Sequence, residues 1–557
     1  SVGSNPLTLS GDITGNGSLI KNGTGLLTLS GDNSYSGGTT VNAGSLAGNS
    51  DSLQGNIATA AGTSVIFNQG ATGTYSGVLS GSGSLVKDGI GNLILSGANT
   101  YTGGTTINAG SLTGDSTSLQ GNIQIGAGSS LIFDQNGNGS FSGSLSGNGD
   151  LIKQGNGNLS LTGNSTLGGN TYINNGVLLV EGSLTSNDII IGAGGALGGG
   201  GSLNGDVTIA TGAHLVAGTY LTPLSFANDL TLTSGTTLDF QLGIPNSPTA
   251  LVSVGGDLTL DGTLNISNAG GLGVGIYRLF SYGGGLTNNG LDFGSLPLGY
   301  DLSNFTLQTS LAGQVNLLLE GAAGEIQFWD GGGTPGDGVI SGGTGTWGPA
   351  LNWTNANGTA TDAWAERFAA FAGTGGTVWV DGAQNFTGMQ FLSNGYVLSD
   401  NNTGSQLNAL ADGNGGSPRI IVDNGVSAEI GISIDGSAGL IKAGAGTLVL
   451  SANNNYTGDT QITGGTLQVS DNDYLGDNSS NLVLNGGLLG VSGTAFTSTT
   501  RGITLGANGG GFDIQDAGNT FTVSQSLSGG GSLIKHGDGT LVLSGSNSYS
   551  GGTLLQG

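Results

Sequence analysis

Residues 81–112 read GSGSLVKDGIGNLILSGANTYTGGTTINAGSL, and residues 15–46 carry nearly the same text, GNGSLIKNGTGLLTLSGDNSYSGGTTVNAGSL. A more divergent copy follows at 147–178, and two further copies begin at 436 and at 529. The first three copies recur with a constant period of 66. Repetition at a fixed period indicates a fold in which each unit stacks on its neighbours.

Within each copy, apolar and polar residues alternate as they do in β-strands. Examples are Leu27-Thr28-Leu29, Leu93-Ile94-Leu95 and Leu448-Val449-Leu450, whose leucines we expect to face inward. Gly and Asn between these runs provide turns with positive φ. The period of 66 divides into three equal turns. We therefore predict an all-β parallel β-helix, or solenoid, of about 22 residues per turn, with turns stacked about 4.8 Å apart.

Two side chains mark the repeat. A lysine recurs at one position of all five copies, at Lys21, Lys87, Lys153, Lys442 and Lys535. A tyrosine recurs in four copies, at Tyr35, Tyr101, Tyr456 and Tyr549, and Leu167 replaces it in the third. The lysines are either structural or a spaced basic row, and we favour the structural interpretation. The tyrosines either cover the edge of each turn or offer a ligand platform, and we favour the first.

Composition excludes several classes of protein. Glycine contributes 117 of 557 residues, without a three-residue period and with only 8 prolines, so the chain is not collagen. There are 35 acidic and 9 basic residues, giving a net charge of −26, which disfavours nucleic acid and anionic lipid as partners. Cysteine is absent, so disulfides are excluded. No apolar run is long enough to span a bilayer as a helix, and we expect no direct membrane insertion.

The repeated pattern, G-S-L-I-K-x-G-x-G-x-L-x-L-S-G-x-N-x-Y-x-G-G-T, resembles the autotransporter-associated β-strand repeat, also called the passenger-associated transport repeat. The resemblance implies a right-handed parallel β-helix that is exported through the outer membrane of a Gram-negative bacterium. It therefore implies an extracellular or outer-membrane location. It covers a passenger region, without the β-barrel translocator that usually follows in such proteins.

The remaining sequence is less regular and suggests four parts. Residues 1–182 hold the first three repeats, and 183–322 continue the β-helix and close it. Residues 323–400 form a tryptophan-rich inserted module, and 401–557 form a second β-helix segment with two repeat copies. The only helix candidate is Asp362–Ala372, although the resemblance would allow a strand there.

All five tryptophans lie in the 323–400 module, at Trp329, Trp347, Trp353, Trp364 and Trp379. They either form the core of this module or form an aromatic cluster that binds a ligand such as a glycan. We favour the core, because large aromatic residues commonly stabilise small cores.

Few residues suggest chemistry. His214 and His536 are isolated from any nucleophile pattern, and we expect no catalytic residues, no cofactor and no enzyme activity. Asp471, Asp473 and Asp477 form the densest acidic loop, a weak candidate for Ca²⁺ that we interpret as a solvated turn.

Two functions remain. The first is an extracellular structural solenoid that polymerises head-to-tail through Leu7 and Leu9 at one end and Leu554 and Leu555 at the other. Alignment of the repeats leaves 23 positions between the phases of Gly557 and Ser1, one predicted turn plus one position, which favours such stacking. The alternative is an adhesin that presents a glycan- or surface-binding module to a host or biofilm surface.

Overall fold

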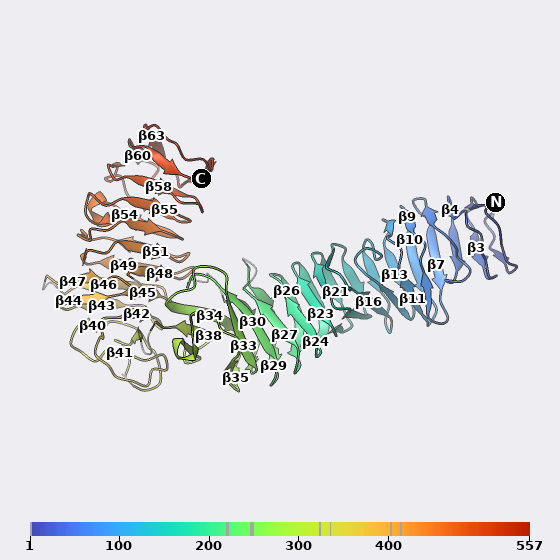
Figure 1. The fold of residues 1–557 in the computed structure, drawn as a ribbon, viewed down its shortest axis with the longest axis horizontal. Helices are drawn as coiled ribbons and strands as arrows, with labels where there is room; N and C mark the ends of the chain where they lie inside the picture. Colours follow the sequence, from blue (N-terminus) through green and yellow to red (C-terminus); the bar gives the residue numbers. More distant parts are fainter. Residues whose placement is uncertain are drawn as a thin grey trace. The chain divides into compact units, whose positions relative to one another are not determined.

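The computed structural model describes residues 3–218, 222–245, 250–321, 325–334, 336–401, 404–412 and 415–556. Short parallel strands dominate them, so the predicted β-solenoid is confirmed (Figure 1). The helical segments of the described chain are two short 3₁₀ turns, η1 (Leu302–Asn304) and η2 (Asn472–Leu475). In the described ranges no helix has the length and apolarity needed to cross a membrane.

The chain folds into two compact units. Unit 1 contains residues 1–241, 251–267 and 281–296, and unit 2 contains residues 242–250, 268–280 and 297–557. The division into parts at 182, 322 and 400 that the sequence suggested stays a prediction.

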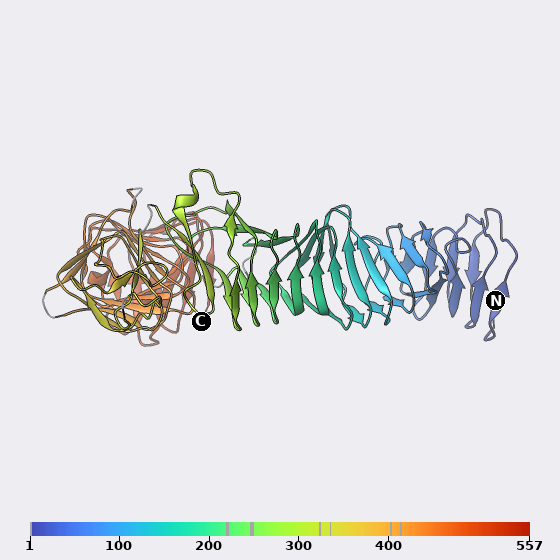
Figure 2. The same cartoon turned by 90° about the horizontal axis from the view of Figure 1, so that it is seen from below.

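Unit 1 is built from parallel ladders, in which each strand pairs with its equivalent one turn earlier and one turn later (Figure 2). The first ladder stacks β1 (Leu7–Leu9), β3 (Leu26–Leu29), β5 (Ser45–Gly48), β7 (Ser64–Asn68), β10 (Ser84–Asp88), β13 (Thr105–Ile107), β15 (Ile123–Ile125), β18 (Leu145–Gly147), β21 (Asn164–Leu167), β24 (Ser183–Ile191), β26 (Ser202–Ile209), β28 (Leu224–Phe226) and β31 (Val252–Val254). The second stacks β8 (Gly73–Tyr75), β11 (Asn92–Leu95), β14 (Ser111–Gly114), β16 (Ser130–Asp134), β19 (Asp150–Gln154), β22 (Thr171–Ile173), β24, β26, β29 (Leu230–Leu232), β32 (Leu258–Leu260) and β35 (Leu286–Asn288).

Two shorter sheets complete the turns of unit 1. One contains β2 (Leu19–Lys21), β4 (Thr39–Val41), β6 (Ile57–Thr59), β9 (Leu79–Gly81) and β12 (Thr100–Tyr101). The other contains β17 (Gly139–Phe141), β20 (Asn158–Leu161), β23 (Gly176–Val180), β25 (Gly195–Gly198), β27 (His214–Ala217), β30 (Thr237–Leu242), β33 (Thr263–Asn268) and β36 (Asp292–Phe293).

The turn of unit 1 is shorter than we predicted. Leu7 pairs with Leu27, and Leu27 pairs with Leu46, so one turn takes about 20 residues, at the short end of the range for solenoid repeats. Each period of 66 then spans about three and a third turns. Successive copies are therefore rotated by one ladder, and the equivalent residues Leu27, Leu93 and Leu159 lie in β3, β11 and β20. This rotation is tolerated because an inward leucine fits the interior equally well from each side.

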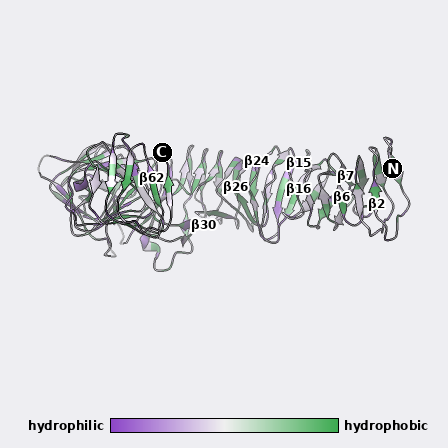
Figure 3. Ribbon diagram, turned by 90° about the horizontal axis from the view of Figure 1, so that it is seen from above, coloured by the Kyte–Doolittle hydropathy of each residue, from purple (hydrophilic) through white to green (hydrophobic). Residues whose placement is uncertain are grey.

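Buried side chains of the strands fill the interior of unit 1. Figure 3 shows hydrophobic residues along the strands. In the first ladder Leu46, Val65 and Leu85 stack on successive turns and are almost fully buried. Turns close tightly at glycine. Gly89 has φ of +79°, and a Cβ there would lie 2.5 Å from the carbonyl oxygen of Gln69 on the previous turn. The interior is thus a packed core of the kind that globular proteins have.

Unit 2 contains a second solenoid. Its first ladder stacks β39 (Ile326–Trp329), β42 (Phe368–Phe371), β45 (Gly388–Phe391), β48 (Arg419–Val422), β51 (Leu440–Ala443), β53 (Thr460–Ile462), β55 (Leu482–Leu484), β58 (Ile503–Leu505) and β61 (Leu527–Gly529), and β41 (Trp353–Thr354) pairs with β39 in antiparallel fashion. Its second ladder stacks β40 (Gly345–Trp347), β43 (Thr377–Val380), β46 (Tyr396–Asp400), β49 (Ser427–Gly431), β52 (Thr447–Leu450), β54 (Thr466–Val469), β56 (Leu488–Val491), β59 (Gly510–Ile514), β62 (Leu533–His536) and β64 (Thr553–Leu555). Two three-stranded sheets complete it, β44 (Ala383–Phe386), β47 (Gln406–Ala409) and β50 (Ile434–Asp435), and β57 (Ser498–Thr499), β60 (Thr520–Val523) and β63 (Thr540–Leu543).

The tryptophan-rich segment provides the first turns of this second solenoid. Phe368 pairs with Ile326 on one side and with Gly388 on the other, in a continuous parallel ladder. The helix candidate at 362–372 is wrong, because its apolar residues form β42 (Phe368–Phe371). All four residues of β42 are buried, so both faces of this strand are covered, and the continuous apolar run suits such a strand.

An outer layer covers one face of unit 2. β34 (Gly275–Tyr282) pairs with β38 (Gln314–Leu319), which forms an antiparallel pair with β37 (Phe305–Gln308). This layer packs on the outward side chains of the first ladder in a second apolar core. The members of that core include Ile276, Leu318, Phe328, Phe368, Leu392 and Ile421.

A buried amide fastens the outer layer to the solenoid. The side chain of Gln390 accepts a hydrogen bond from the Ile276 N–H at 2.8 Å and donates to the Ile276 carbonyl at 3.0 Å. Its Nε2 also donates to Oδ1 of Asp423 at 3.0 Å. Nη2 of Arg278 lies 3.8 Å from Oδ2 of Asp423, and burial raises the pKa of this carboxyl to about 6. The layer is thus held by polar as well as apolar contacts.

Candidate functional site

The repeated lysines point into the interior of the solenoid. Lys87 stands in the column of Phe67 and Ile107, and its exposed fraction is 0%. Its Nζ donates hydrogen bonds to the carbonyls of Asp88, Gly89 and, one turn further, Ala109, at 2.7–2.9 Å. An ammonium group has three donors, so the three bonds satisfy it.

The same arrangement recurs in later copies. Lys153 donates to the carbonyls of Gln154, Gly155 and Asn175, and Lys442 to those of Ala443, Gly444 and Gly464. Burial lowers the pKa of Lys153 to about 8 and that of Lys442 to about 7. Lys21 makes two such bonds, and Lys535, which is partly exposed, donates to Gly537. Buried ammonium groups of this kind bridge turns and are not available to a partner.

The tyrosines are paired with threonines of the same copy. The hydroxyl of Tyr101 bonds to Oγ1 of Thr105 at 2.7 Å, and both residues are buried. Tyr35, Tyr456 and Tyr549 make the equivalent bond to Thr39, Thr460 and Thr553.

Sequence reasoning missed an asparagine two positions before each tyrosine. Asn99 accepts a hydrogen bond from the Leu79 N–H at 2.8 Å and donates to the Ser118 carbonyl at 2.7 Å, which joins three consecutive turns. Asn33 and Asn454 do the same. In the third copy Ser165 accepts from Leu145 instead. The signal in the sequence that could have predicted this bridge is the asparagine that recurs in the N-x-Y motif.

Four of the five tryptophans gather in one cluster at the start of the second solenoid. Trp329, Trp347 and Trp353 have an exposed fraction of 0%, and Trp364 is partly buried against them. Ring centroids lie 5.3 Å apart for Trp329 and Trp353, 5.0 Å for Trp347 and Trp353, and 4.4 Å for Trp353 and Trp364. Rings buried in this way contribute to the core and offer no face to a ligand.

Trp379 lies apart from this cluster. It faces outward on β43 with 38% of its surface exposed, between Thr346 and Ser399 of the neighbouring strands. It is the tryptophan that a ligand could reach.

The acidic loop at 471–477 is organised by an arginine. Arg501 is buried, and its guanidinium donates to the carbonyls of Asn472, Gly476, Asp477 and Ser480 at 2.6–3.2 Å. Asp471 accepts a hydrogen bond from the Asp473 N–H, and Asp477 accepts from Ser479, which lowers the pKa of Asp477. Within the described ranges no three acidic, histidine or cysteine residues gather as metal ligands. The guanidinium therefore holds the backbone of this loop, and the Ca²⁺ site stays a weak prediction.

Each histidine contacts one aspartate. His214 Nδ1 lies 2.6 Å from Oδ2 of Asp239, and His536 Nδ1 lies 3.1 Å from Oδ1 of Asp513. Both pairs are partly or largely exposed on outer strand faces. No serine, threonine or cysteine in the described part of the chain hydrogen-bonds to either ring.

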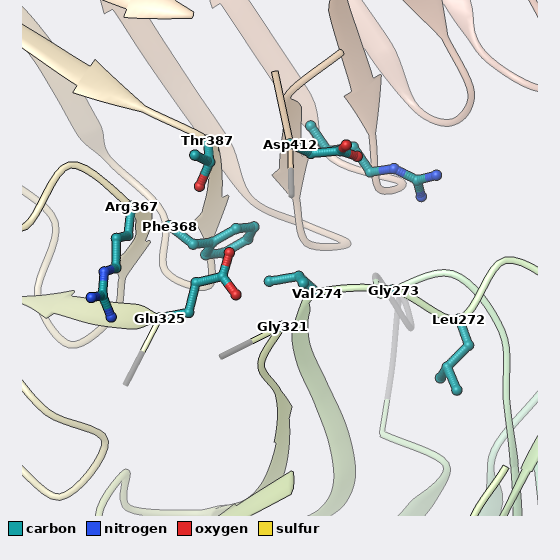
Figure 4. Close-up of a pocket in the computed structure, with 10 residues that line it drawn as sticks. Leu272, Gly273, Val274, Gly321, Glu325, Arg367, Phe368, Thr387 and Asp412 are labelled. Atoms are coloured by element: carbon teal, nitrogen blue, oxygen red, sulfur yellow. The ribbon is translucent and has the colours of Figure 1, made fainter. Parts of the chain in front are cut away.

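A pocket of about 530 Å³ opens in unit 2, where the outer layer meets the first ladder (Figure 4). Glu325 directs its carboxylate toward the centre beside the ring of Phe368 and the methyl groups of Val274 (Figure 4). Residues from separate stretches of the chain line the pocket: Leu272, Gly273, Val274, Gly321, Glu325, Arg367, Phe368, Thr387, Asp412 and Arg419. Concave sites with an apolar floor and a few converging polar groups are typical ligand sites.

The terminal leucines belong to β1 and β64. Leu7 is 44% exposed, Leu554 is 47% exposed and Leu555 is 76% exposed, whereas Leu9 is partly buried. Because the turn is shorter than predicted, the 23 positions between the two phases no longer correspond to one turn plus one position. The register therefore does not favour head-to-tail stacking, which finds no support from known proteins and stays a prediction.

Stacked turns, interior lysines and bridging asparagines define a β-solenoid that is built from sequence repeats. The passenger-associated-transport-repeat family matches residues 19–47, 85–113, 151–180, 440–469 and 533–557. These five segments contain every repeat lysine and every repeat tyrosine. The resemblance to autotransporter passenger regions is confirmed.

Among characterised proteins, the chain is similar to the adhesin BmaC autotransporter of Brucella suis biovar 1 (strain 1330). The two are 40% identical over 337 residues, or 56% of this chain, and the chain spans about 9% of that relative's length. Together with the repeats, this similarity places the chain at the extracellular or outer-membrane surface of a Gram-negative bacterium.

Proposed function

We propose that this chain is a non-enzymatic, adhesin-type passenger segment that attaches its bacterium to an external surface. The observation that carries the proposal is the 40% identity over 337 residues with an autotransporter adhesin. The relative is much longer than this chain, so the function of the whole relative is extended here to one segment of it.

The structure supports a binding role over a catalytic one. The interior is filled by side chains, the repeat lysines are buried, and each histidine is occupied by an aspartate on an outer face. What the chain offers to a partner is a stiff stack of strands with polar outer faces and the pocket of unit 2. A stack of this kind resists local opening because each turn is paired on both sides.

A bead assay tests the proposal. The purified chain is coupled to micrometre beads, and the retention of these beads is counted on epithelial cells, on extracellular matrix and on an abiotic film. Beads carrying the urea-unfolded chain provide the control, since they have identical charge and composition. We expect several-fold greater retention of the folded chain on at least one surface. Equal retention of both kinds of bead on all surfaces would reject the adhesin function.

A further inference from the structure

The pocket of unit 2 has a preformed apolar floor. Phe368 packs on Gly388, where an added Cβ would lie 2.6 Å from the ring, so the ring is held in one position. Val274 belongs to the outer layer and packs against the same apolar core as Phe368. Phe368 is 3% exposed, so Val274, which is partly buried, is the side chain of this floor that can contact the C–H face of a ring-shaped ligand.

Polar groups of both charges surround this floor. The Glu325 carboxylate lies over Gly321, where an added Cβ would be only 2.5 Å from Oε2. The carboxylate can occupy this position because residue 321 is a glycine. Asp412 is fixed by a hydrogen bond of 2.6 Å from the Gly416 N–H to its Oδ1. Arg367 and Arg419 supply two cations to the lining of the pocket.

The charge of the molecule narrows the class of ligand. The chain has a net charge of −26, and most of its lysines are buried in the solenoid interior. Its surface is therefore strongly anionic and repels an acidic ligand. A basic ligand would gain from the carboxylates but would meet two arginines in the pocket. A neutral polyol avoids repulsion by the anionic surface and by the two arginines. Each of its hydroxyls can donate to a carboxylate and accept from a guanidinium.

We propose that this pocket binds a neutral sugar unit of a surface glycan. One ring face rests on the partly buried side chain of Val274, beside the buried ring of Phe368. Hydroxyls donate to Glu325 and Asp412, and Arg419 donates to a ring or hydroxyl oxygen. The volume of about 530 Å³ lies in the range of small-ligand sites. The inference rests on the proposed adhesin function, since it names the ligand class that the adhesin would recognise.

The first experiment measures binding by the full chain in solution and on an array of neutral and acidic oligosaccharides. Saturation-transfer NMR then uses methyl glycosides of galactose, mannose and N-acetylglucosamine as probes. We expect retention of neutral glycans and signal from at least one glycoside. Binding to none of these sugars, or to acidic glycans alone, would overturn the proposal.

Three variants locate the site. Glu325→Gln keeps the shape and removes a charged acceptor, and we expect at least tenfold weaker binding. Gly273→Phe adds a large side chain to the lining of the pocket, at a position where a Cβ meets only the Gly271 carbonyl oxygen, at 3.9 Å, and we expect no saturable binding. Glu429→Gln, on β49 of the second ladder, is the matched control and should stay within twofold of the parent.

Circular dichroism and melting of each variant exclude unfolding as the cause. Parental binding by a folded Gly273→Phe chain would overturn the pocket assignment. Beads that adhere without any sugar binding would refute the pocket and leave the adhesin function standing. Sugar binding by a chain whose beads do not adhere would refute the adhesin function and leave the pocket.

Discussion

The asparagine bridge of the repeat gives the sharpest test of how the solenoid is held together. Asn454 is 5% exposed; its Oδ1 accepts from the Ile434 N–H at 2.7 Å, and its Nδ2 donates to the Tyr474 carbonyl at 2.6 Å. Asn454→Ala leaves one buried donor and one buried acceptor without partners. Each such group costs about 1–3 kcal/mol, so the change should destabilise these turns by about 3–4 kcal/mol.

The neighbouring residue supplies the control. Asn455 is exposed, and its side chain bonds only to Asp435 at the surface, so Asn455→Ala should cost less than about 0.5 kcal/mol. Hydrogen exchange with mass spectrometry on peptides covering 434–475 measures the difference locally. We expect Asn454→Ala to accelerate exchange there by about 10²–10³-fold, which follows from about 1.4 kcal/mol per factor of ten. Equal exchange in the two variants would refute the bridge.

Buried groups of unit 2 give four further predictions. Trp353→Ala empties the centre of the tryptophan cluster and should cost about 3–5 kcal/mol in urea unfolding, whereas the outward Trp379→Ala should cost less than about 1 kcal/mol. The pKa of Asp423 is raised from 3.8 to about 6, so the folded state binds more protons than the unfolded state between these pH values. The stability of unit 2 should therefore fall as pH rises from about 4 to 6. Urea titrations of Asp423→Asn should show a flatter pH dependence, and an unchanged dependence would contradict this role of Asp423. The pKa of Lys442 is lowered from 10.5 to about 7, so the unfolded state binds more protons than the folded state between pH 7 and 10.5. Stability should therefore rise with pH in this range, and the Lys442→Met variant should lack this rise. Arg501→Gln should speed proteolysis within the loop at 471–480, and added Ca²⁺ should not restore protection; restoration by Ca²⁺ would show that the carboxylates form a cation site after all.

Local alternation was enough to predict the strands and most of the core. Leu27, Leu93 and Leu448 are buried as expected. Apolar residues at every second position all lie on one face of a strand, and that face turns to the interior. Turn length was not available from the same pattern. A period of 66 fits three longer turns as well as three and a third shorter ones, and only the pairing of Leu7 with Leu27 decides between them.

Non-local packing explains what the sequence did not predict. The segment 362–372 has helical composition, yet Phe368 and its neighbours form a strand because a ladder and an outer layer cover both of its faces. Arg501 lies more than a full turn beyond the Asn472 carbonyl that it binds, and the pocket combines residues from Leu272 to Arg419. Neither the Arg501 contacts nor the pocket residues form a sequence motif, because these contacts depend on how turns and layers stack.

The repeat also explains why an acidic surface and a stable interior coexist in one chain. Four of the five copies bury their recurring lysine. There Nζ of Lys87 or Lys442 binds three carbonyls, two just after the lysine and one on the next turn. The lysines therefore link turns and neutralise almost none of the surface charge. The outer faces keep their carboxylates and repel identical chains, which opposes lateral association between neighbouring molecules. A partner must then be recognised by a local feature such as the pocket of unit 2, and not by the general charge of the solenoid.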